Sequence, residues 1–251
     1  MPIDVQVREG IAHVVLNDPP LNILTQALLS DLRGVLAELA GDDTLRVLLL
    51  SAEGKHFSAG ASVEEHLPGT VEEMIPEFIE TIQLLHDFPV PVVCGVHGRC
   101  LGGALELALA ADLVIAAEGA LLGVPEISLG VLPPAACVQL PRLVAPGVAA
   151  ELVFTGAPID AASALAAGLV LRVVPPQELV TETTRLASAI ARHSAAALRV
   201  TKKTLRAGTG TADAAMNEAS RLYLHDLMRT ADATEGLQSF MEKRKPQWTH
   251  S

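Results

Sequence analysis

Aromatic side chains are scarce in this chain of 251 residues: only 3% of the residues are Phe, Trp or Tyr, although half are apolar. The core must therefore be built from Ala, Val, Leu and Ile. Such small side chains suit closely packed layers of helices and sheet better than a β-sandwich. The length corresponds to one large domain or two small ones, with enough chain for a full core.

Cysteine is also rare, with only Cys94, Cys100 and Cys137 and no C-x-x-C spacing. An odd number without a motif excludes a disulfide framework and fits small buried side chains in a reducing compartment. The opening ten residues carry acidic and basic groups and no apolar run, which is not the pattern of a signal peptide. We therefore expect a cytoplasmic protein.

A long uncharged apolar run is missing too, although the mean hydropathy is +0.38. The best candidate, residues 100–117, contains Glu106 and Asp112, whereas a membrane span needs about 20 apolar residues with few charges. We expect a buried helix that runs into a buried strand, and no membrane partner. The net charge of −11 argues against nucleic acid as a partner.

Charge is unevenly distributed: residues 192–251 contain ten Lys or Arg against six Asp or Glu, in a chain that is acidic overall. A solvated basic face on terminal helices and a contribution to a phosphate-bearing ligand site both fit this pattern.

Short apolar runs rich in β-branched residues predict strands. They are Ile11–Leu16, Leu45–Leu50, Val90–Val96, Leu113–Ala116 and Leu169–Val174. Leucines at helical spacing predict helices over Thr25–Ala40 and Val71–Asp87. This alternation predicts an α/β fold with a largely parallel sheet.

The strand signal stops at about Pro175, and only helical patterns follow. They cover Gln177–His193, Ala195–Arg206, Ala212–Arg229 and Asp232–Lys245. We therefore expect an α/β core over residues 1–190, which carries the functional site, and a helical C-terminal region over residues 191–251.

Three glycine-containing segments stand out as places where backbone comes close to another group. They are Phe57–Ser62, His97–Glu106 and Gly123–Gly130. The second segment reads as a strand, a Gly-rich turn and a helix that begins near Gly102 and Gly103. Free N–H groups and the positive end of the helix dipole at this turn favour an anionic oxygen.

Glu106 falls one turn into this apolar helix, on the face that leans back toward the opening. An unpartnered carboxylate there costs several kcal/mol to bury. The pattern leaves two interpretations open, a carboxylate that caps the first turn and a carboxylate that is used in chemistry.

Other chemical templates are absent. The sequence lacks G-x-S-x-G, the P-loop, G-x-G-x-x-G and H-E-x-x-H, and its eight histidines show no ligand spacing, so we expect no metal. His97 is more typical of a structural strand end than of a base. Lys55 and His56 fit a polar turn as well as they fit contact with phosphates.

Taken together, these segments resemble the enoyl-CoA hydratase/isomerase (crotonase) family in order and spacing. The resemblance covers most of the chain and includes Asn17–Asn22, Phe57–Ala61, His97–Asp112, Pro125–Gly130 and Leu140–Val144. The set is specific for the fold and for coenzyme A thioesters, and less so for the reaction.

The resemblance implies a crotonase-like spiral of ββα units, with a helical C-terminal region that builds a homotrimer or a dimer of trimers. It places the backbone N–H groups of Ala61 and Gly103 in an oxyanion hole for the thioester carbonyl. Glu106 and Glu126 match the two catalytic acids of the family's hydratases. Further positions at the substrate are Ala59, Gly60, Gly102 and Pro134.

The implied reaction is addition of water to an enoyl group, or its removal, on an acyl-CoA substrate. Two acids in one apolar pocket hold one proton between them, so one can accept a proton while the other donates. We assign Glu126 as donor to Cα and Glu106 as activator of water. No metal or redox cofactor is needed, because coenzyme A is part of the substrate.

Three alternatives remain open. A double-bond isomerase or decarboxylase can use the same scaffold, although both acids are retained here. A catalytically silent CoA-ester-binding or assembly subunit is the second. A serine hydrolase would use Ser58 or Ser62, but no His and Asp partners stand at recognisable positions.

The chain departs from the family pattern at three places. Ser62 replaces the family's Asp, and Glu64 stands where a basic residue is common. Pro134 replaces a glycine whose N–H points toward the reacting water in typical hydratases, and proline has no N–H. A Pro-Pro-Ala stretch here resembles the hydratases that act on cyclic dienoyl-CoA esters.

Overall fold

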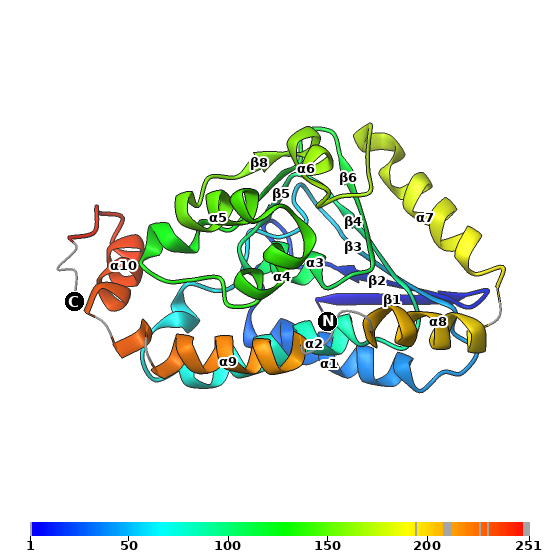
Figure 1. Ribbon diagram of the computed structural model, residues 1–251, viewed down its shortest axis with the longest axis horizontal. Coiled ribbons are helices and arrows are strands. Elements are labelled where there is room, and N and C mark those ends of the chain that lie inside the picture. Colours follow the sequence, from blue (N-terminus) through cyan, green and yellow to red (C-terminus); the bar gives the residue numbers. More distant parts are fainter. Residues whose placement is uncertain (1, 194, 208–211, 226, 230, 248–251) are drawn as a thin grey trace.

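The computed structural model (Figure 1) describes residues 2–193, 195–207, 212–225, 227–229 and 231–247. The strands are β1 (Ile3–Arg8), β2 (Ile11–Leu16), β3 (Val47–Ala52), β4 (Val92–Val96), β5 (Arg99–Leu101), β6 (Leu113–Ala117), β7 (Leu121–Gly123), β8 (Ile159–Asp160) and β9 (Arg172–Val174). The α-helices are α1 (Gln26–Ala40), α2 (Val71–His86), α3 (Gly103–Leu109), α4 (Ala136–Leu143), α5 (Pro146–Thr155), α6 (Ala161–Ala167), α7 (Leu179–Ile190), α8 (Ala195–Ala207), α9 (Ala212–His225) and α10 (Ala231–Met241). The short 3₁₀ helices are η1 (Glu64–His66), η2 (Pro125–Leu129), η3 (Pro176–Glu178) and η4 (Leu227–Arg229).

The strands form two sheets in the described part of the chain. The larger has the order β1-β2-β3-β4-β6-β9, and only its β1–β2 pair is antiparallel. The largely parallel α/β sheet predicted from the sequence is therefore confirmed. The smaller sheet, β5-β7-β8, carries the Gly-rich turn at the end of β5.

Alternating side chains of β3 supply both faces of the larger sheet, as a period of two requires. Leu48 and Leu50 belong to the main core, which also contains the buried faces of α1 and α2. Val47 and Leu49 point the other way and pack with Ala187 of α7. Both faces are covered, so β3 reads as a continuous apolar run.

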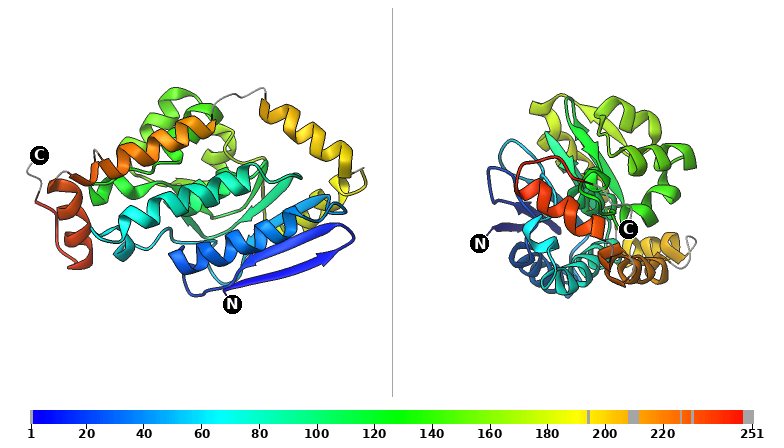
Figure 2. Two further views of the ribbon diagram at one scale, coloured as in Figure 1. Left: turned by 90° about the horizontal axis from the view of Figure 1, so that it is seen from below. Right: turned by 90° about the vertical axis from the view of Figure 1, so that its left-hand side faces the viewer.

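Helices follow β9, as expected, and the sequence analysis placed α7 to α10 correctly in outline. Figures 1 and 2 show α7 across one face of the sheet and α9 alongside α2. Helix α10 packs against η2, the segment that carries Glu126. The C-terminal region therefore packs against the segment that carries Glu126. None of the described helices is long and apolar enough to cross a membrane.

Several strands were missed. β1 was not predicted because its alternating residues are mostly exposed and only Ile3 is buried. β5, β7 and β8 have only three, three and two residues, which is too short for a periodic signal.

Candidate active site

The site begins where β5 ends and the chain turns sharply into α3. Gly102 precedes the helix with φ of +56°, a conformation that side chains disfavour. Glu106 lies in the first turn, as predicted, and is only 2% exposed. The turn therefore brings a buried carboxyl group and the open N-terminus of a helix to one place.

Glu126 reaches the same turn from η2. A Cβ atom at position 102 would lie only 2.6 Å from Oε1 of Glu126. The carboxyl group thus occupies the space that any larger residue at Gly102 would fill. The second and third glycine-containing segments meet here.

The first segment also lies close to this turn. Gly60 has φ of +112°, and a Cβ atom there would lie 2.8 Å from the carbonyl oxygen of Leu101. Its N–H donates to Oγ of the buried Ser58 at 3.1 Å. A Cβ atom at Gly103 would lie 3.4 Å from Cβ of Ala61, so these two residues are neighbours.

Two backbone donors remain without acceptors at this junction. The N–H groups of Ala61 and Gly103 form no hydrogen bond with any residue that the structure describes. Gly103 is the first residue of α3, where an N–H has no partner within the helix. Neighbouring free donors of this kind suit a carbonyl oxygen that gains negative charge.

Glu106 is held by the start of α4. Its Oε1 accepts a hydrogen bond of 2.8 Å from the N–H of Ala136, and its backbone oxygen accepts one of 3.1 Å from Nε2 of Gln139. Burial raises the pKa of Glu106 from 4.5 to about 7, while the N–H groups of Ala136 and Ala135 pull the pKa down. Desolvation is thus the larger effect.

Glu126 has fewer partners. Although the residue as a whole is partly exposed, its Oε2 is buried and has no hydrogen-bond partner among the described residues. Burial, and then the charge of Glu106, raise the pKa of Glu126 well above its ordinary value. Two carboxyl groups in this setting favour a state with one shared proton.

Pro134 is buried in the turn that leads into α4. It has no N–H, yet the next two N–H groups, those of Ala135 and Ala136, both act on Glu106. Pro134, which departs from the family pattern, therefore lies beside Glu106. The N–H of Ala59 donates to the carbonyl oxygen of Leu21 at 2.9 Å.

Some supporting residues were missed by the sequence analysis. Asn22 is fully buried, and its amide donates to the carbonyls of Glu53, His56 and Phe57, which holds the loop before Ala61. It lay within a quoted motif but was given no role. Gln139 gave no signal, because its amide reaches the carbonyl of Glu106 only through the fold.

The polar residues before the first glycine segment are structural in part. Nδ1 of His56 faces the N–H of Arg99 at 3.2 Å, and Nε2 of His97 faces the carbonyl of Gly54 at 3.1 Å. The part of the chain that the structure describes holds no cluster of His, Cys, Asp and Glu that could bind a metal ion.

Neither a cysteine nor a serine nucleophile is supported. Burial raises the pKa of Cys94 and Cys100, and burial together with the two acids raises that of Cys137 to about 11. Thiols are nucleophilic as thiolates, so these shifts oppose reactivity. The hydroxyl of Ser58 is buried in the turn that it holds.

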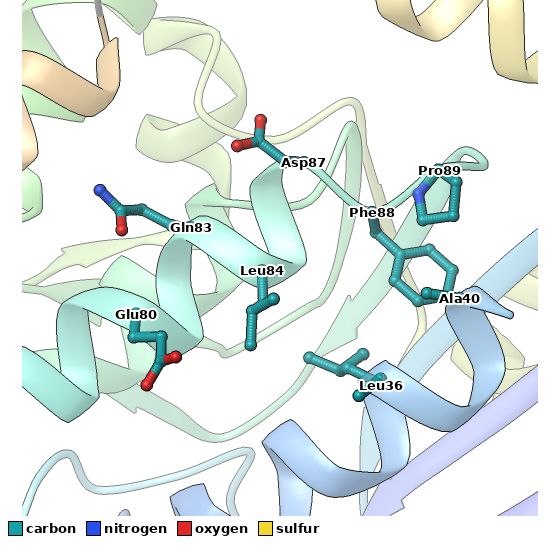
Figure 3. Close-up of a pocket in the computed structure, with 9 residues that line it drawn as sticks. Leu36, Ala40, Glu80, Gln83, Leu84, Asp87, Phe88 and Pro89 are labelled. Carbon is teal, nitrogen blue, oxygen red and sulfur yellow. The ribbon is translucent and has the colours of Figure 1, made fainter.

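A surface groove lies elsewhere, between α1 and α2 (Figure 3). Its lining includes Leu36, Leu84 and Phe88, with Glu80 and Asp87 at its polar side. No residue of the acid pair or of the Ala61–Gly103 junction lines it. We therefore assign the site by the convergence of acids and free N–H groups, and not by the groove.

Comparison with known proteins identifies the family of the chain. The family model for enoyl-CoA hydratase/isomerase matches residues 6–251. The chain is 37% identical to cyclohexa-1,5-dienecarbonyl-CoA hydratase of Thauera aromatica, over 96% of this chain and 94% of the relative. It is 35% identical to a probable enoyl-CoA hydratase of Mycobacterium bovis, over 98% and 97%.

Solved structures show the same likeness. An enoyl-CoA hydratase/isomerase from Pseudoalteromonas atlantica superposes with a TM-score of 0.91 at 28% identity, covering 99% of this chain and 100% of that one. An enoyl-CoA hydratase from Mycobacterium avium subsp. paratuberculosis gives 0.88 at 27%, covering 99% of both chains. The crotonase-like fold is confirmed, and the chain belongs to the enoyl-CoA hydratase/isomerase family.

Proposed function

We propose that the chain is a hydratase-type lyase that adds water across the double bond of an unsaturated acyl-CoA thioester. One observation carries the proposal: the buried carboxyl groups of Glu106 and Glu126 converge on a turn that also offers two backbone N–H groups without acceptors. Family membership, and relatives whose names are hydratases, support the same reaction type.

The N–H groups of Ala61 and Gly103 are proposed to receive the thioester carbonyl oxygen. Both belong to the chain's own backbone and need no reorganisation when charge develops on that oxygen. One such preorganised donor is typically worth about 10²–10³ in rate. The small residues Ala59, Gly60 and Gly102 let the thioester approach the backbone.

The two acids are proposed to divide the proton transfers. Glu106 accepts hydrogen bonds from the start of α4, which favours its ionised form, so it is the base that activates water. Glu126 has an unpartnered buried oxygen, and both burial and the charge of Glu106 raise its pKa, so it keeps the proton and acts as the acid. The environments of the two groups thus differ in the sense that the reaction needs.

The proposed step balances as follows. A water molecule gives a proton to Glu106 and forms a bond from its oxygen to Cβ. The π electrons of the double bond move toward the thioester, and Cα takes the proton of Glu126. Transfer of the proton from Glu106 to Glu126 restores the starting state, with H and OH added to the substrate. The route needs no cofactor beyond the coenzyme A portion of the substrate.

A cyclic dienoyl-CoA ester is the substrate that we propose to test first. The Thauera aromatica relative carries such a substrate in its name. The Pro-Pro-Ala stretch at Pro133–Ala135 lies beside Glu106, where a change in the surroundings of the reacting water bears directly on the substrate. Short-chain and longer enoyl-CoA esters complete the test set.

A second candidate function is isomerisation or decarboxylation on the same scaffold. Pro134 favours it, because a site without an N–H at this position has one donor fewer to hold a water molecule. Retention of both acids favours hydration. A silent CoA-ester-binding subunit is the remaining outcome.

The deciding experiment incubates the purified protein with crotonyl-CoA, longer enoyl-CoA esters and a cyclic dienoyl-CoA in ¹⁸O-labelled water. We expect one ester to gain one water molecule that carries the label. Exchange or migration of hydrogen without gain of water, or loss of carbon dioxide, would move the assignment to isomerase or decarboxylase. If the esters bind but none of them changes, the chain would be assigned as a catalytically silent CoA-ester-binding subunit.

We also propose a homotrimer or a dimer of trimers, in a reducing compartment such as the cytoplasm. Exposed apolar side chains support assembly: Phe154 of α5 is 76% exposed, and Ile127, Phe240 and Met241 are exposed on η2 and α10, which contact one another or α5. Light scattering should give about three or six times the 26.3 kDa of one chain. All three cysteines are free, as a reducing compartment requires.

A further inference from the structure

Tyr223 is a buried polar residue that the two-acid scheme does not use. The side chain is 0% exposed, and its hydroxyl has no hydrogen-bond partner among the described residues. A buried hydroxyl without a partner is destabilising, so tyrosines in protein cores usually have one. We therefore expect the hydroxyl of Tyr223 to find its partner in a molecule that binds at the site during the reaction.

The position of Tyr223 is set by α9, which packs against both α2 and α4. Helix α4 is the one whose Ala136 N–H binds Glu106. On the other side, the tyrosine ring lies 6.1 Å from the ring of His66, centroid to centroid. His66 is tied through Nδ1 to the carbonyl of Ser62, the residue after Ala61, at 2.7 Å. Tyr223 is thus connected through α9 to the helix that binds Glu106, and through His66 to the residue after Ala61.

Electrostatics agree with this placement. Besides burial, the charges of Glu126 and then Glu106 raise the pKa of Tyr223. The hydroxyl is therefore close enough to sense both carboxyl groups, and it stays protonated and able to donate. Oε2 of Glu126 is likewise buried and unpartnered in the described part of the chain. A water molecule between these atoms would give each of them a partner.

We propose that the Tyr223 hydroxyl donates a hydrogen bond to the reacting water, and so replaces the backbone N–H that Pro134 cannot offer. The inference rests on the proposed hydratase function. It answers the physical problem set by the proline: Glu106 accepts a proton of the water and Glu126 gives its own proton to Cα, so the water oxygen needs another donor to fix its direction of attack. Tyr223 supplies that donor from the C-terminal helical region.

Tyr223→Phe removes only the hydroxyl. We expect kcat for hydration to fall about tenfold to a hundredfold, the effect of one hydrogen bond to a charged or reacting group, with little change in KM. The melting temperature should stay equal or rise, because the lost hydroxyl has no partner in the protein. A merely structural tyrosine would instead lower the melting temperature and leave kcat of the folded fraction unchanged.

Pro134→Gly provides the matched test by rescue, because it restores an N–H beside Glu106. If the hydroxyl and the N–H serve the same water, Pro134→Gly should raise kcat more in the Tyr223→Phe background than in the native chain. Equal effects in both backgrounds would show that the two positions act independently, and would overturn the proposal.

A readout without turnover separates this inference from the proposed function. Tyr223 is the only tyrosine in the chain, so ¹³Cζ-labelled tyrosine gives a single NMR signal that reports this hydroxyl. At one pH, Glu106→Gln and Glu126→Gln should both move the signal, whereas the exposed Glu118→Gln should not. A signal unmoved by both site variants would overturn the proposal whether or not any ester is hydrated. If no ester gains water with the native chain, the proposed function fails on its own, and the proposed role in hydration fails with it even if the signal moves.

Discussion

The carboxyl group of Glu126 lies against the bare Cα of Gly102, at the turn from β5 into α3. A Cβ atom at position 102 would come within 2.6 Å of Oε1 of Glu126. The same glycine has φ of +56°, which suits glycine and few other residues. One residue thus serves two needs: it turns the chain into α3 and leaves room for the acid.

Gly102→Ala should therefore displace Glu126 as well as strain the turn. We expect a destabilisation of about 1 kcal/mol or more from the positive φ, and a much larger loss of hydration. Gly119→Ala is the matched control, because its φ is +77° but nothing lies within 4 Å of its Cβ position. Urea unfolding and hydration rates are measured for both variants. If both variants lost activity in step with stability, the contact with Glu126 would be unimportant.

Gly236 permits α10 to seat against η2. A Cβ atom there would overlap the backbone of Leu129 and Gly130, just beyond Glu126. Gly236→Ala should destabilise the chain by about 1–3 kcal/mol, as overpacking does, and should lower hydration by moving η2. Gly34→Ala in α1 meets nothing within 4 Å and should stabilise by up to about 1 kcal/mol. The stability of both variants is measured by thermal unfolding. A Gly236→Ala variant as stable as the native chain would contradict the packing of α10 against η2.

Glu106 also predicts how stability depends on pH. Its pKa is raised by burial to about 7, so between pH 4.5 and 7 the folded chain holds a proton that the unfolded chain has lost. The contribution is present in full below about pH 4.5, falls as pH rises, and is gone above about pH 7. The difference corresponds to about 3 kcal/mol at most.

The measurement is urea unfolding of the native chain and Glu106→Gln from pH 5 to pH 8. We expect the native chain to lose stability relative to the variant as pH rises, because glutamine has no proton to lose. Parallel curves would mean that Glu106 titrates near its ordinary pKa of 4.5 and is not desolvated as the structure shows.

Helix α8 is tied to the core by an ion pair whose lysine is buried. Nζ of Lys202, whose side chain is 5% exposed, lies 2.7 Å from Oδ2 of Asp112 and also donates to Val90 at 3.0 Å. Asp112→Ala leaves that ammonium buried without its carboxylate, and should cost about 3 kcal/mol. Arg185→Ala breaks a more exposed pair with Glu182 and should cost much less, because water screens that pair. Similar losses of stability for the two variants in chemical unfolding would show that water solvates the ammonium group of Lys202 once Asp112 is removed.

Much of the fold follows from local sequence pattern. β2 was predicted with the bounds that the structure has, and α1 differs by one residue, because Thr25 caps the helix from outside. These elements have a strong period and a clear stop. The start of α3 and the first-turn place of Glu106 were also predictable, since the Gly-rich turn and the apolar helix that follows are contiguous in the chain.

Other parts of the site depend on contacts between distant segments. The hydrogen bond from Ala136 to Glu106 joins positions that are 30 residues apart, and no local sequence pattern at Ala136 predicts it. The proposed role of Tyr223 depends in the same way on the packing of α9 against α2 and α4. The strands β5 and β7 are too short to show a hydrophobic period in the sequence. Their pairing nevertheless sets the relative positions of the glycine segments.

The central claim is that Glu106 and Glu126 share the proton transfers of hydration, and isotopic labelling of the two glutamine variants tests it most directly. Glu106→Gln and Glu126→Gln, with Glu118→Gln as the exposed control, are incubated in ¹⁸O-labelled water with the ester that the native chain prefers. Product mass gives turnover, and calorimetry gives affinity for a saturated CoA ester. We expect each site variant to lose at least about 10²-fold in hydration while binding the ester nearly as well as the native chain and the control. Native rates of label uptake in either site variant would contradict the two-acid account.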